Sequence, residues 1–252
     1  MTPRETLRAA GRGLRLGAMT GLEVSHLLVD ARRHPGVFAL RDAHVRRWAA
    51  GVLDALAVRR AVQYASPLAE GYLVGGRMVV SSHRSMLDIP ILLSCFGGHL
   101  LSRDDLAKWP VVGRLAPLAG TLYVDRSSLA SGAAALRVMT ERLDAGRTVG
   151  VFAEGTTYPD DLVRPFHPGA FVAASRSGAE IVPVGMAYAD PRATYFQEPF
   201  GAHARRLIAA PETLVAVRVG APIAARGCSA RALTAKVHAT VQTLVDEARQ
   251  SL

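Results

Sequence analysis

The sequence predicts an α/β protein in which a mixed sheet is flanked by helices and preceded by an N-terminal two-helix element. From about residue 71, short apolar runs alternate with segments of helical periodicity, the pattern of a sheet covered by helices. Residues 3–57 have helical spacing instead, with a break at His34-Pro35-Gly36. We therefore expect a basic amphipathic helical hairpin at residues 1–60 and an α/β domain at residues 61–252.

The N-terminal region is strongly basic. The chain has a formal net charge of +9, and residues 1–60 hold eleven arginines against five acidic residues. We expect one helix at residues 3–33 and a second at residues 41–57, in which Val45, Trp48 and Val52 recur at helical spacing. Such a hairpin either lies on an anionic membrane surface, with its apolar face among the lipid headgroups, or packs on the domain as ordinary surface helices.

Six strands and five helices are expected in the α/β domain. The apolar runs predict strands at residues 72–81, 99–102, 121–124, 148–153, 180–186 and 214–219. Helical spacing predicts helices at residues 87–96, shortly after Pro110, and at residues 129–145, 169–177 and 230–250. Pro183 falls inside the strand at residues 180–186, which predicts an edge strand or a strand end there.

Composition argues against several classes of protein. Cys95 and Cys228 are too few for a disulfide framework and lack metal-ligand spacing, so we expect a reducing compartment and no metal. No signal-peptide pattern opens the chain, and no run of about 18 uncharged apolar residues predicts a spanning helix. The positive charge alone would permit nucleic-acid binding, but we find no nucleic-acid module and expect no such partner.

The segment SSHRSMLDIP at residues 81–90 places an imidazole and a carboxylate at the end of a predicted buried strand. Catalytic sites of open α/β sheets collect at this edge. His83 is suited to act as a general base near neutral pH, and Asp88 would fix its tautomer and stabilise the imidazolium. Arg84 and Ser85 lie between them as candidate substrate-binding residues. The alternative is that Asp88 caps a helix and His83 is a polar strand end.

Three further segments place polar residues at strand ends. In GTLYVDR, from Gly120 to Arg126, the arginine next to Asp125 could grip a phosphate, or the two could pair within a turn. In VFAEGTT, residues 151–157, Gly155 allows a ligand to approach the backbone, or the segment is a capped turn. In IVPVG, residues 181–185, Pro183 is a candidate wall of the site.

The order and spacing of HxxxxD, GxxxVDR, EGT and IVPVG resemble the 1-acylglycerol-3-phosphate acyltransferase family over about residues 70–190, and the linker at residues 100–126 is similar too. The resemblance implies that His83, oriented by Asp88, deprotonates the hydroxyl of a lysolipid, which attacks an acyl thioester of coenzyme A or acyl carrier protein, with no cofactor. It implies that Arg126, Glu154, Gly155 and Thr156 bind the head group of 1-acyl-sn-glycerol-3-phosphate. Val182 and Pro183 would line the acyl-donor side.

In bacterial members of that family a two-helix element docks on the membrane, which favours the membrane interpretation of residues 1–60. We therefore expect a peripheral protein on the cytoplasmic face of the inner membrane. Thr157 departs from the family pattern, which has an arginine there that helps to hold the acceptor phosphate, and His167 stands near another altered basic position. Arg164 could substitute, or the acceptor is lyso-ornithine lipid or another lysolipid.

Two other classes of function remain to be compared with this one. A catalytically silent, membrane-binding member of the fold would most simply have lost His83 or Asp88, and both are present. A serine hydrolase of the common α/β type would carry a GxSxG elbow, which the sequence lacks.

Overall fold

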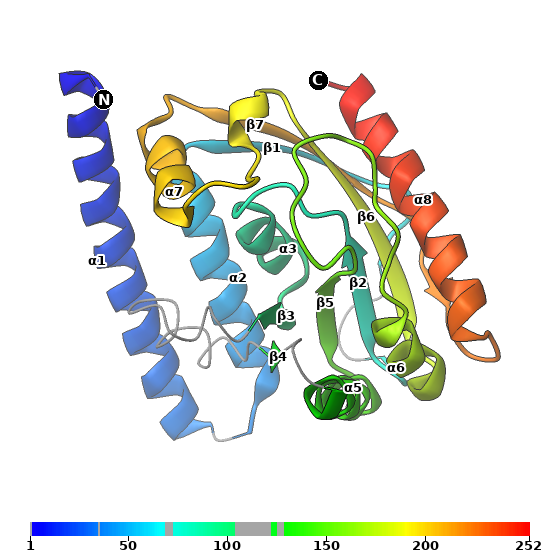
Figure 1. Cartoon of the computed structure of the whole chain (residues 1–252). Coiled ribbons are helices and arrows are strands. Elements are labelled where there is room, and N and C mark those ends of the chain that lie inside the picture. The colour runs from blue at the N-terminus through cyan, green and yellow to red at the C-terminus, as the bar shows by residue number, and fades with distance from the viewer. Residues whose placement is uncertain (1, 35, 69–72, 104–121, 125–128) are drawn as a thin grey trace.

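The computed structural model describes residues 2–34, 36–68, 73–103, 122–124 and 129–252 and has the expected α/β architecture (Figure 1). The helices are α1 (Pro3–Arg33), α2 (Phe38–Ala55), α3 (Asp88–Phe96), α5 (Leu129–Asp144), α6 (Gly169–Ser177), α7 (Phe200–Ala209) and α8 (Ala230–Gln250), with a short 3-10 helix η2 (Pro191–Ala193). The strands are β1 (Val58–Tyr64), β2 (Arg77–Ser81), β3 (His99–Arg103), β4 (Leu122–Val124), β5 (Thr148–Phe152), β6 (Glu180–Tyr188), β7 (Thr213–Val219) and β8 (Ile223–Ala224).

The sheet is mixed, and its central strands are parallel. The strand order is β1-β7-β6-β2-β5-β3-β4, with β8 beside β6. Strand β2 pairs in parallel with β5 and β6, so Ser81 lies between Phe152 and Val184. Strand β7 is antiparallel to β6 and parallel to β1. The carboxyl ends of β2, β5 and β6 therefore point to the same edge of the sheet.

A hydrophobic core lies on each face of the sheet. Alternate residues of β2 pack into the two cores. Val79 packs with residues of α2 and α3, whereas Met78 and Val80 pack with residues of α5, α6 and α8. Helix α8 buries six residues at helical spacing: Leu233, Val237, Val241, Leu244, Val245 and Ala248. It packs so close to β6 that a Cβ atom at Gly185 would clash with the helix backbone at Leu244. The packing of α8 therefore requires glycine at that position.

The two N-terminal helices differ in how much they bury. Helix α1 buries none of its described side chains, whereas α2 buries His44, Val45, Ala49, Leu53 and Ala55. Polar contacts hold α1 in place. His44 of α2 lies 2.6 Å from Glu23 and 2.9 Å from Asp30, and Arg8 donates to the carbonyl of Ala209 at the end of α7. The predicted pair of helices is thus present, and α1 lies along the outside (Figure 1).

Several predicted boundaries were wrong. The strand expected from residue 72 begins at Arg77, because Gly75 and Gly76 adopt positive φ angles of 80° and 63° that interrupt extended backbone. Residues 58–60, which we had placed in the hairpin region, begin β1, a strand that the sequence analysis missed together with β8 and α7. The short helix expected after Pro110 lies outside the described residues.

Pro183 lies inside an interior strand, so the expectation of an edge strand or strand end was wrong. Residues Glu180 and Ile181 of β6 pair with β8, and pairing with β7 starts at Val184. Pro183 falls between these two ladders, where a missing N–H is tolerated. Its carbonyl still accepts a hydrogen bond from the Gly220 N–H at 2.9 Å.

Candidate active site

The polar residues of the predicted site gather where β2, β5 and β6 end. Ser81, Phe152 and Tyr188 are the last residues of these three neighbouring strands. His83 follows β2 by two residues and Glu154 follows β5 by two. Because the strands are parallel, these residues share one edge of the sheet, as expected for an α/β site.

His83 and Asp88 form a hydrogen-bonded pair. Nδ1 of His83 lies 2.9 Å from Oδ2 of Asp88, which is the first residue of α3. A carboxylate only accepts, so the ring proton sits on Nδ1 and Nε2 carries the free electron pair. The His83 ring stacks on Phe152 with centroids 3.9 Å apart, and 18% of its side chain is exposed. The ring is thus fixed by both contacts and still reachable from outside.

Asp88 is fully buried but well supplied with donors. Its Oδ2 atom also accepts hydrogen bonds from the backbone N–H groups of Arg84 at 2.6 Å and Ser85 at 2.8 Å. Its Oδ1 atom accepts one from the hydroxyl of Tyr188 at 2.5 Å. Both carboxylate oxygens therefore have hydrogen-bond donors, and the carboxylate is placed to stabilise a positive charge on His83. The residue before the helix, Leu87, occupies the N-cap position, so Asp88 is not a simple helix cap.

Glu154 and Arg84 form a second buried pair beside the first. Oε1 of Glu154 accepts from Nη1 of Arg84 at 2.9 Å and from the backbone N–H of His83 at 3.0 Å. Its Oε2 atom accepts from the backbone N–H of Arg164 at 2.8 Å. Only 1% of Arg84 and 4% of Glu154 is exposed. Both charges are therefore directed into the protein and tie the His83 loop to the loop after β5.

The loop after β5 presents small groups toward solvent. Gly155 adopts a positive φ of 80°, Thr156 is exposed, and Thr157 is buried. Arg164, the residue that could replace the missing arginine, pairs with Asp160 at 2.7 Å. Its guanidinium carbon lies 4.9 Å from the centroid of the Tyr158 ring.

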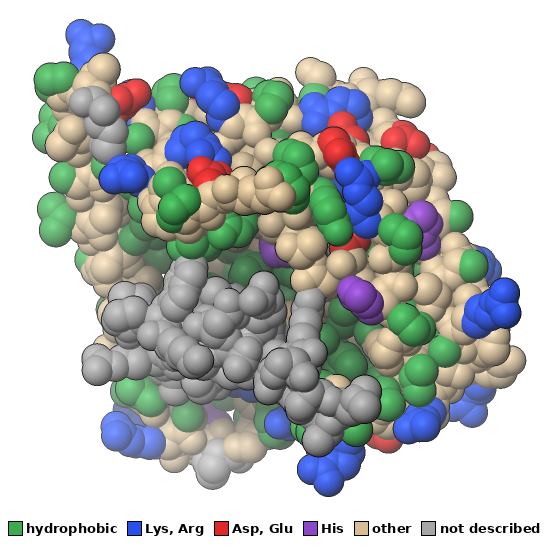
Figure 2. Space-filling view, in the orientation of Figure 1, with side chains coloured by type: hydrophobic (Ala, Val, Ile, Leu, Met, Phe, Trp, Pro, Cys, Tyr) green, Lys and Arg blue, Asp and Glu red, His purple; other side chains and the backbone are tan. Residues whose placement is uncertain are grey.

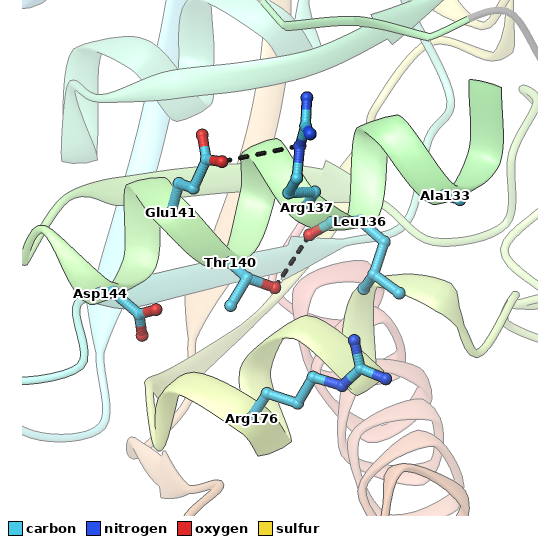
Figure 3. Close-up of a pocket in the computed structure, with 7 residues that line it drawn as sticks. All are labelled: Ala133, Leu136, Arg137, Thr140, Glu141, Asp144 and Arg176. Atoms are coloured by element: carbon cyan, nitrogen blue, oxygen red, sulfur yellow. Dashed lines mark hydrogen bonds and ion pairs between the residues drawn. The ribbon is translucent and has the colours of Figure 1, made fainter. Parts of the chain in front are cut away.

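Other predicted residues lie apart from this cluster or outside the structure. Gly120, Asp125 and Arg126 fall outside the described residues. Pro183 is buried in the sheet beside Val80. A surface pocket between α5 and α6 is lined by Ala133, Leu136, Arg137, Thr140, Glu141, Asp144 and Arg176 (Figure 3). It lies in the helix layer and includes none of the predicted site residues.

Two residues near Asp88 were missed by the sequence analysis. Tyr188 is 100 residues from Asp88 along the chain, and His203 belongs to the missed helix α7. Nε2 of His203 lies 3.3 Å from the Ser85 hydroxyl. Burial, reinforced by the nearby Arg206, lowers the pKa of His203 to about 4, so its ring is neutral at neutral pH. No local motif marks either residue, since strand register and helix packing bring them here.

The arrangement is suited to general-base catalysis on a hydroxyl. A partly exposed imidazole, oriented by a buried carboxylate, can remove a proton and hold the resulting charge. Among the described residues no cluster of three or more His, Cys, Asp or Glu side chains could hold a metal ion.

The chain is similar to proteins named as acyltransferases. The family described as Acyltransferase matches residues 63–187. The chain is 30% identical over 215 residues to a lyso-ornithine lipid O-acyltransferase of Pseudomonas aeruginosa, covering 82% of this chain and 81% of that one. It is 29% identical over 115 residues to the 1-acyl-sn-glycerol-3-phosphate acyltransferase of Neisseria gonorrhoeae, covering 46% of this chain and 45% of that protein.

The fold is also found in a solved structure. The 1-acyl-sn-glycerophosphate acyltransferase PlsC from Thermotoga maritima matches with a TM-score of 0.73, over 97% of this chain and 95% of that one. The sequence identity is 21%, so this likeness establishes the shared fold.

Proposed function

The chain belongs to the acyltransferase family, and from that premise we propose that it transfers a fatty acyl group from a thioester to the free hydroxyl of a membrane lysolipid. The observation that carries the proposal is the 2.9 Å contact between His83 Nδ1 and Asp88 Oδ2 at the carboxyl edge of the sheet. Both residues stand at the HxxxxD positions that the family resemblance assigned to catalysis.

The reaction follows from this geometry. Nε2 of His83 takes the proton of the acceptor hydroxyl as the oxygen attacks the thioester carbonyl carbon. The carboxylate of Asp88 stabilises the imidazolium that forms. When the tetrahedral intermediate collapses, the new ester C–O bond remains, the C–S bond breaks, and the proton passes from Nε2 to the thiolate. The donor is a thioester of coenzyme A or of acyl carrier protein.

Removing the base tests this mechanism. His83→Ala should reduce thiol release from the acyl donor by at least about 100-fold, because general-base catalysis contributes roughly that much. His26→Ala is a matched control, since His26 is an exposed residue of α1, outside the loops that carry His83 and Glu154. Turnover retained by a folded His83→Ala protein contradicts the mechanism. An inactive wild-type protein with every acceptor and donor would favour the catalytically silent alternative.

For the acceptor, we favour lyso-ornithine lipid over lysophosphatidate. Thr157 replaces the family's phosphate-binding arginine. Arg84 is buried against Glu154, and Arg164 pairs with Asp160, so neither charge is directed at an open phosphate site. The Pseudomonas relative that matches four fifths of the chain carries the corresponding name. An ornithine head group has a carboxylate and an ammonium group, and so makes less demand on arginine than a phosphomonoester does.

Offering the two acceptors separately tests this preference. We expect faster thiol release with lyso-ornithine lipid, and Thr157→Arg should shift the ratio toward lysophosphatidate. Thr157→Ser is the matched control, because it keeps the small hydroxyl. Faster release with lysophosphatidate by the wild-type protein would overturn the preference and leave the acyl-transfer proposal intact. Arg126 would then be the candidate residue for binding the phosphate.

We also place the protein at an anionic membrane surface, on the cytoplasmic face, through α1. In the described part of the chain, no helix is long and apolar enough to cross a membrane. Helix α1 nevertheless leaves large apolar side chains exposed: Leu7, Leu14, Leu22, Leu28 and Val29. Along the outer edge at the left of Figure 2, where α1 lies in Figure 1, hydrophobic side chains stand next to basic ones. Apolar groups next to arginines are typical of helices that lie in the headgroup region.

Vesicle binding tests this placement on the full chain. Replacing Leu7, Leu14 and Leu22 by serine should reduce sedimentation with vesicles of anionic phospholipid, while the melting temperature stays unchanged because none of the three is buried. Leu214→Ser removes an exposed leucine from β7 and serves as the control. Undiminished binding of the triple variant would show that α1 is not the anchor.

A further inference from the structure

One hydrogen bond to the catalytic carboxylate comes from a residue outside every predicted motif. The hydroxyl of Tyr188 donates to Oδ1 of Asp88 at 2.5 Å, and only 1% of Tyr188 is exposed. Tyr188 is the last residue of β6, the strand that pairs with β2. Its ring therefore reaches Asp88 from a different element than the His83 loop does.

The two oxygens of Asp88 are held by different parts of the fold. Oδ2 accepts hydrogen bonds from Nδ1 of His83 and from the backbone N–H groups of residues 84 and 85. All three donors belong to the loop that precedes α3. Oδ1 accepts a hydrogen bond from the hydroxyl of Tyr188, which belongs to the sheet. With only the Oδ2 contacts, the carboxylate could rotate about its Cβ–Cγ bond. The Tyr188 contact opposes that rotation, and with it a tilt of the His83 ring.

Tyr188 holds the carboxylate without cancelling its charge. Burial, and next the neighbouring Asp88 carboxylate, raise the pKa of Tyr188 well above its ordinary value. The phenol therefore stays neutral and remains a donor throughout the working pH range. An arginine in its place would add a positive charge and weaken the attraction between Asp88 and the imidazolium.

Polar groups lie next to Tyr188 in turn. The Ser85 side chain faces the Tyr188 hydroxyl and opposes the rise of its pKa, and Ser85 Oγ lies 3.3 Å from Nε2 of His203. Nδ1 of His203 lies 3.0 Å from Nη2 of Arg206, and its Nε2 lies 3.3 Å from the backbone nitrogen of Met86. Glu198 pairs with Arg206 at 2.6 Å. The network thus runs from a half-buried ion pair on α7 to the catalytic carboxylate.

We propose that Tyr188 is a positioning residue for acyl transfer, one that fixes the orientation of Asp88 and through it the His83 ring, and that Ser85 and His203 support it. This inference rests on the proposed function, because it assigns a role relative to His83 as general base. Volume alone does not explain a tyrosine here. A phenylalanine would fill the same space without burying a hydroxyl, and a buried hydroxyl is costly unless it is bonded.

The test is Tyr188→Phe in the full chain, assayed by thiol release over a range of pH. We expect kcat to fall on the order of tenfold with KM for the acyl donor unchanged, because loss of alignment acts on the transition state. The acid limb of the kcat/KM profile should move to higher pH. A carboxylate with one donor fewer both attracts the imidazolium more strongly and protonates more readily.

Two variants complete the design. Tyr195→Phe is the matched control, since its ring packs 5.0 Å from the His203 ring but its hydroxyl makes no hydrogen bond with Asp88. It should keep the wild-type rate and pH profile. Ser85→Ala keeps the backbone N–H that Asp88 needs and removes only the hydroxyl. A smaller loss of kcat in the same direction is expected, and this variant tests the network if Tyr188→Phe does not fold.

The outcomes separate the inference from the proposed function. If His83→Ala is inactive while Tyr188→Phe and Ser85→Ala keep the wild-type kcat and pH profile, the positioning role is overturned and acyl transfer through His83 stands. If His83→Ala keeps full activity, the mechanism itself fails. A tenfold loss in Tyr188→Phe with an unmoved pH profile would mean a packing defect, and would also overturn the proposed role.

Discussion

Asp88 and Glu154 are two buried carboxylates that lie on either side of the same loop, yet their surroundings differ. Glu154 pairs with the guanidinium of Arg84 at 2.9 Å, so its charge is neutralised by a full positive charge. Asp88 takes its hydrogen bonds from backbone N–H groups, a phenol and the His83 imidazole. The contact of Asp88 with His83 is the one in which a positive charge can appear and disappear during a reaction.

This difference shows how one loop can be both rigid and reactive. A carboxylate whose charge is already matched by arginine holds the loop in place and has little attraction left for an imidazolium. A carboxylate held by neutral donors has no cation matched to it, so its attraction for an imidazolium is kept. His83 and Arg84 bond to both carboxylates, so the structural ion pair and the reactive pair are built on the same backbone segment.

The largest expected effect comes from neutralising Asp88. Asp88→Asn should lower kcat by about 10³-fold, roughly 4 kcal/mol of transition-state stabilisation, because the neutral amide no longer stabilises the imidazolium. We expect the melting temperature to change little, since the amide oxygen can still accept from the backbone donors. Kinetics of thiol release and thermal unfolding measure the two effects. A folded Asp88→Asn protein with near wild-type kcat would remove the distinction between the two carboxylates.

Neutralising Glu154 should affect folding instead. Glu154→Gln leaves the buried Arg84 guanidinium without a counter-charge, so we expect the free energy of unfolding to drop by about 3 kcal/mol. Below the melting temperature, kcat should fall less than tenfold. Denaturant unfolding followed by circular dichroism tests the stability. Equal stability of Glu154→Gln and wild type would show that the Arg84–Glu154 ion pair does not stabilise the fold.

A double replacement tests whether the cost of Glu154→Gln comes from the unpaired charge of Arg84. Arg84→Met combined with Glu154→Gln removes both charges, so the double variant should be more stable than Glu154→Gln alone, by about 1–2 kcal/mol. A double variant less stable than Glu154→Gln alone would mean that the cost is lost packing of the arginine stem, not an unpaired charge.

An effect of similar size should appear only at low pH, on the Asp88 side. The pKa of His203 is about 4 in the folded protein against 6.5 for the unperturbed group, because of burial and then of Arg206. The unfolded chain therefore binds this proton at higher pH than the folded protein. The stability contribution is complete above about pH 6.5 and is lost as the pH falls toward 4, amounting to about 2 kcal/mol at pH 5.

Comparing denaturant unfolding at pH 8 and pH 5 tests this effect. His203→Gln lacks the titrating group, so it should lose about 2 kcal/mol less than wild type between the two pH values. The comparison with wild type removes the contribution of carboxylates that titrate in the same range. Parallel losses in both proteins would show that His203 does not take part in the acid sensitivity.

Local patterns predicted much of this site. The five-residue spacing of His83 and Asp88 needs only one short loop. The strand ends predicted from apolar runs, Ser81 and Ala153, lie within one residue of the observed ends. Family resemblance added the expected roles of these residues. The strand at residues 148–153 and the helices at residues 169–177 and 230–250 match the structure within one residue.

What the sequence analysis missed depends on distant contacts. Strand β1 has the alternating, partly charged sequence VRRAVQY, and it becomes a strand by pairing with β7. Tyr188 reaches Asp88 because β6 continues four residues past Val184, the partner of Ser81. Helix α7 carries His203, but its short sequence shows only one clear turn of apolar spacing. Register and packing of this kind cannot be seen in one segment alone.

The pairing of β1 with β7 also bears on how the chain is synthesised. Val58 pairs with Thr213, so the partner of β1 is made 155 residues later. At a ribosomal rate of about 5–20 residues per second, β1 waits roughly 10–30 s before β7 is available. During that interval its backbone N–H and C=O groups have no strand to pair with, and unpaired edges favour aggregation. The nascent chain therefore exposes an unpaired edge strand until β7 has been made.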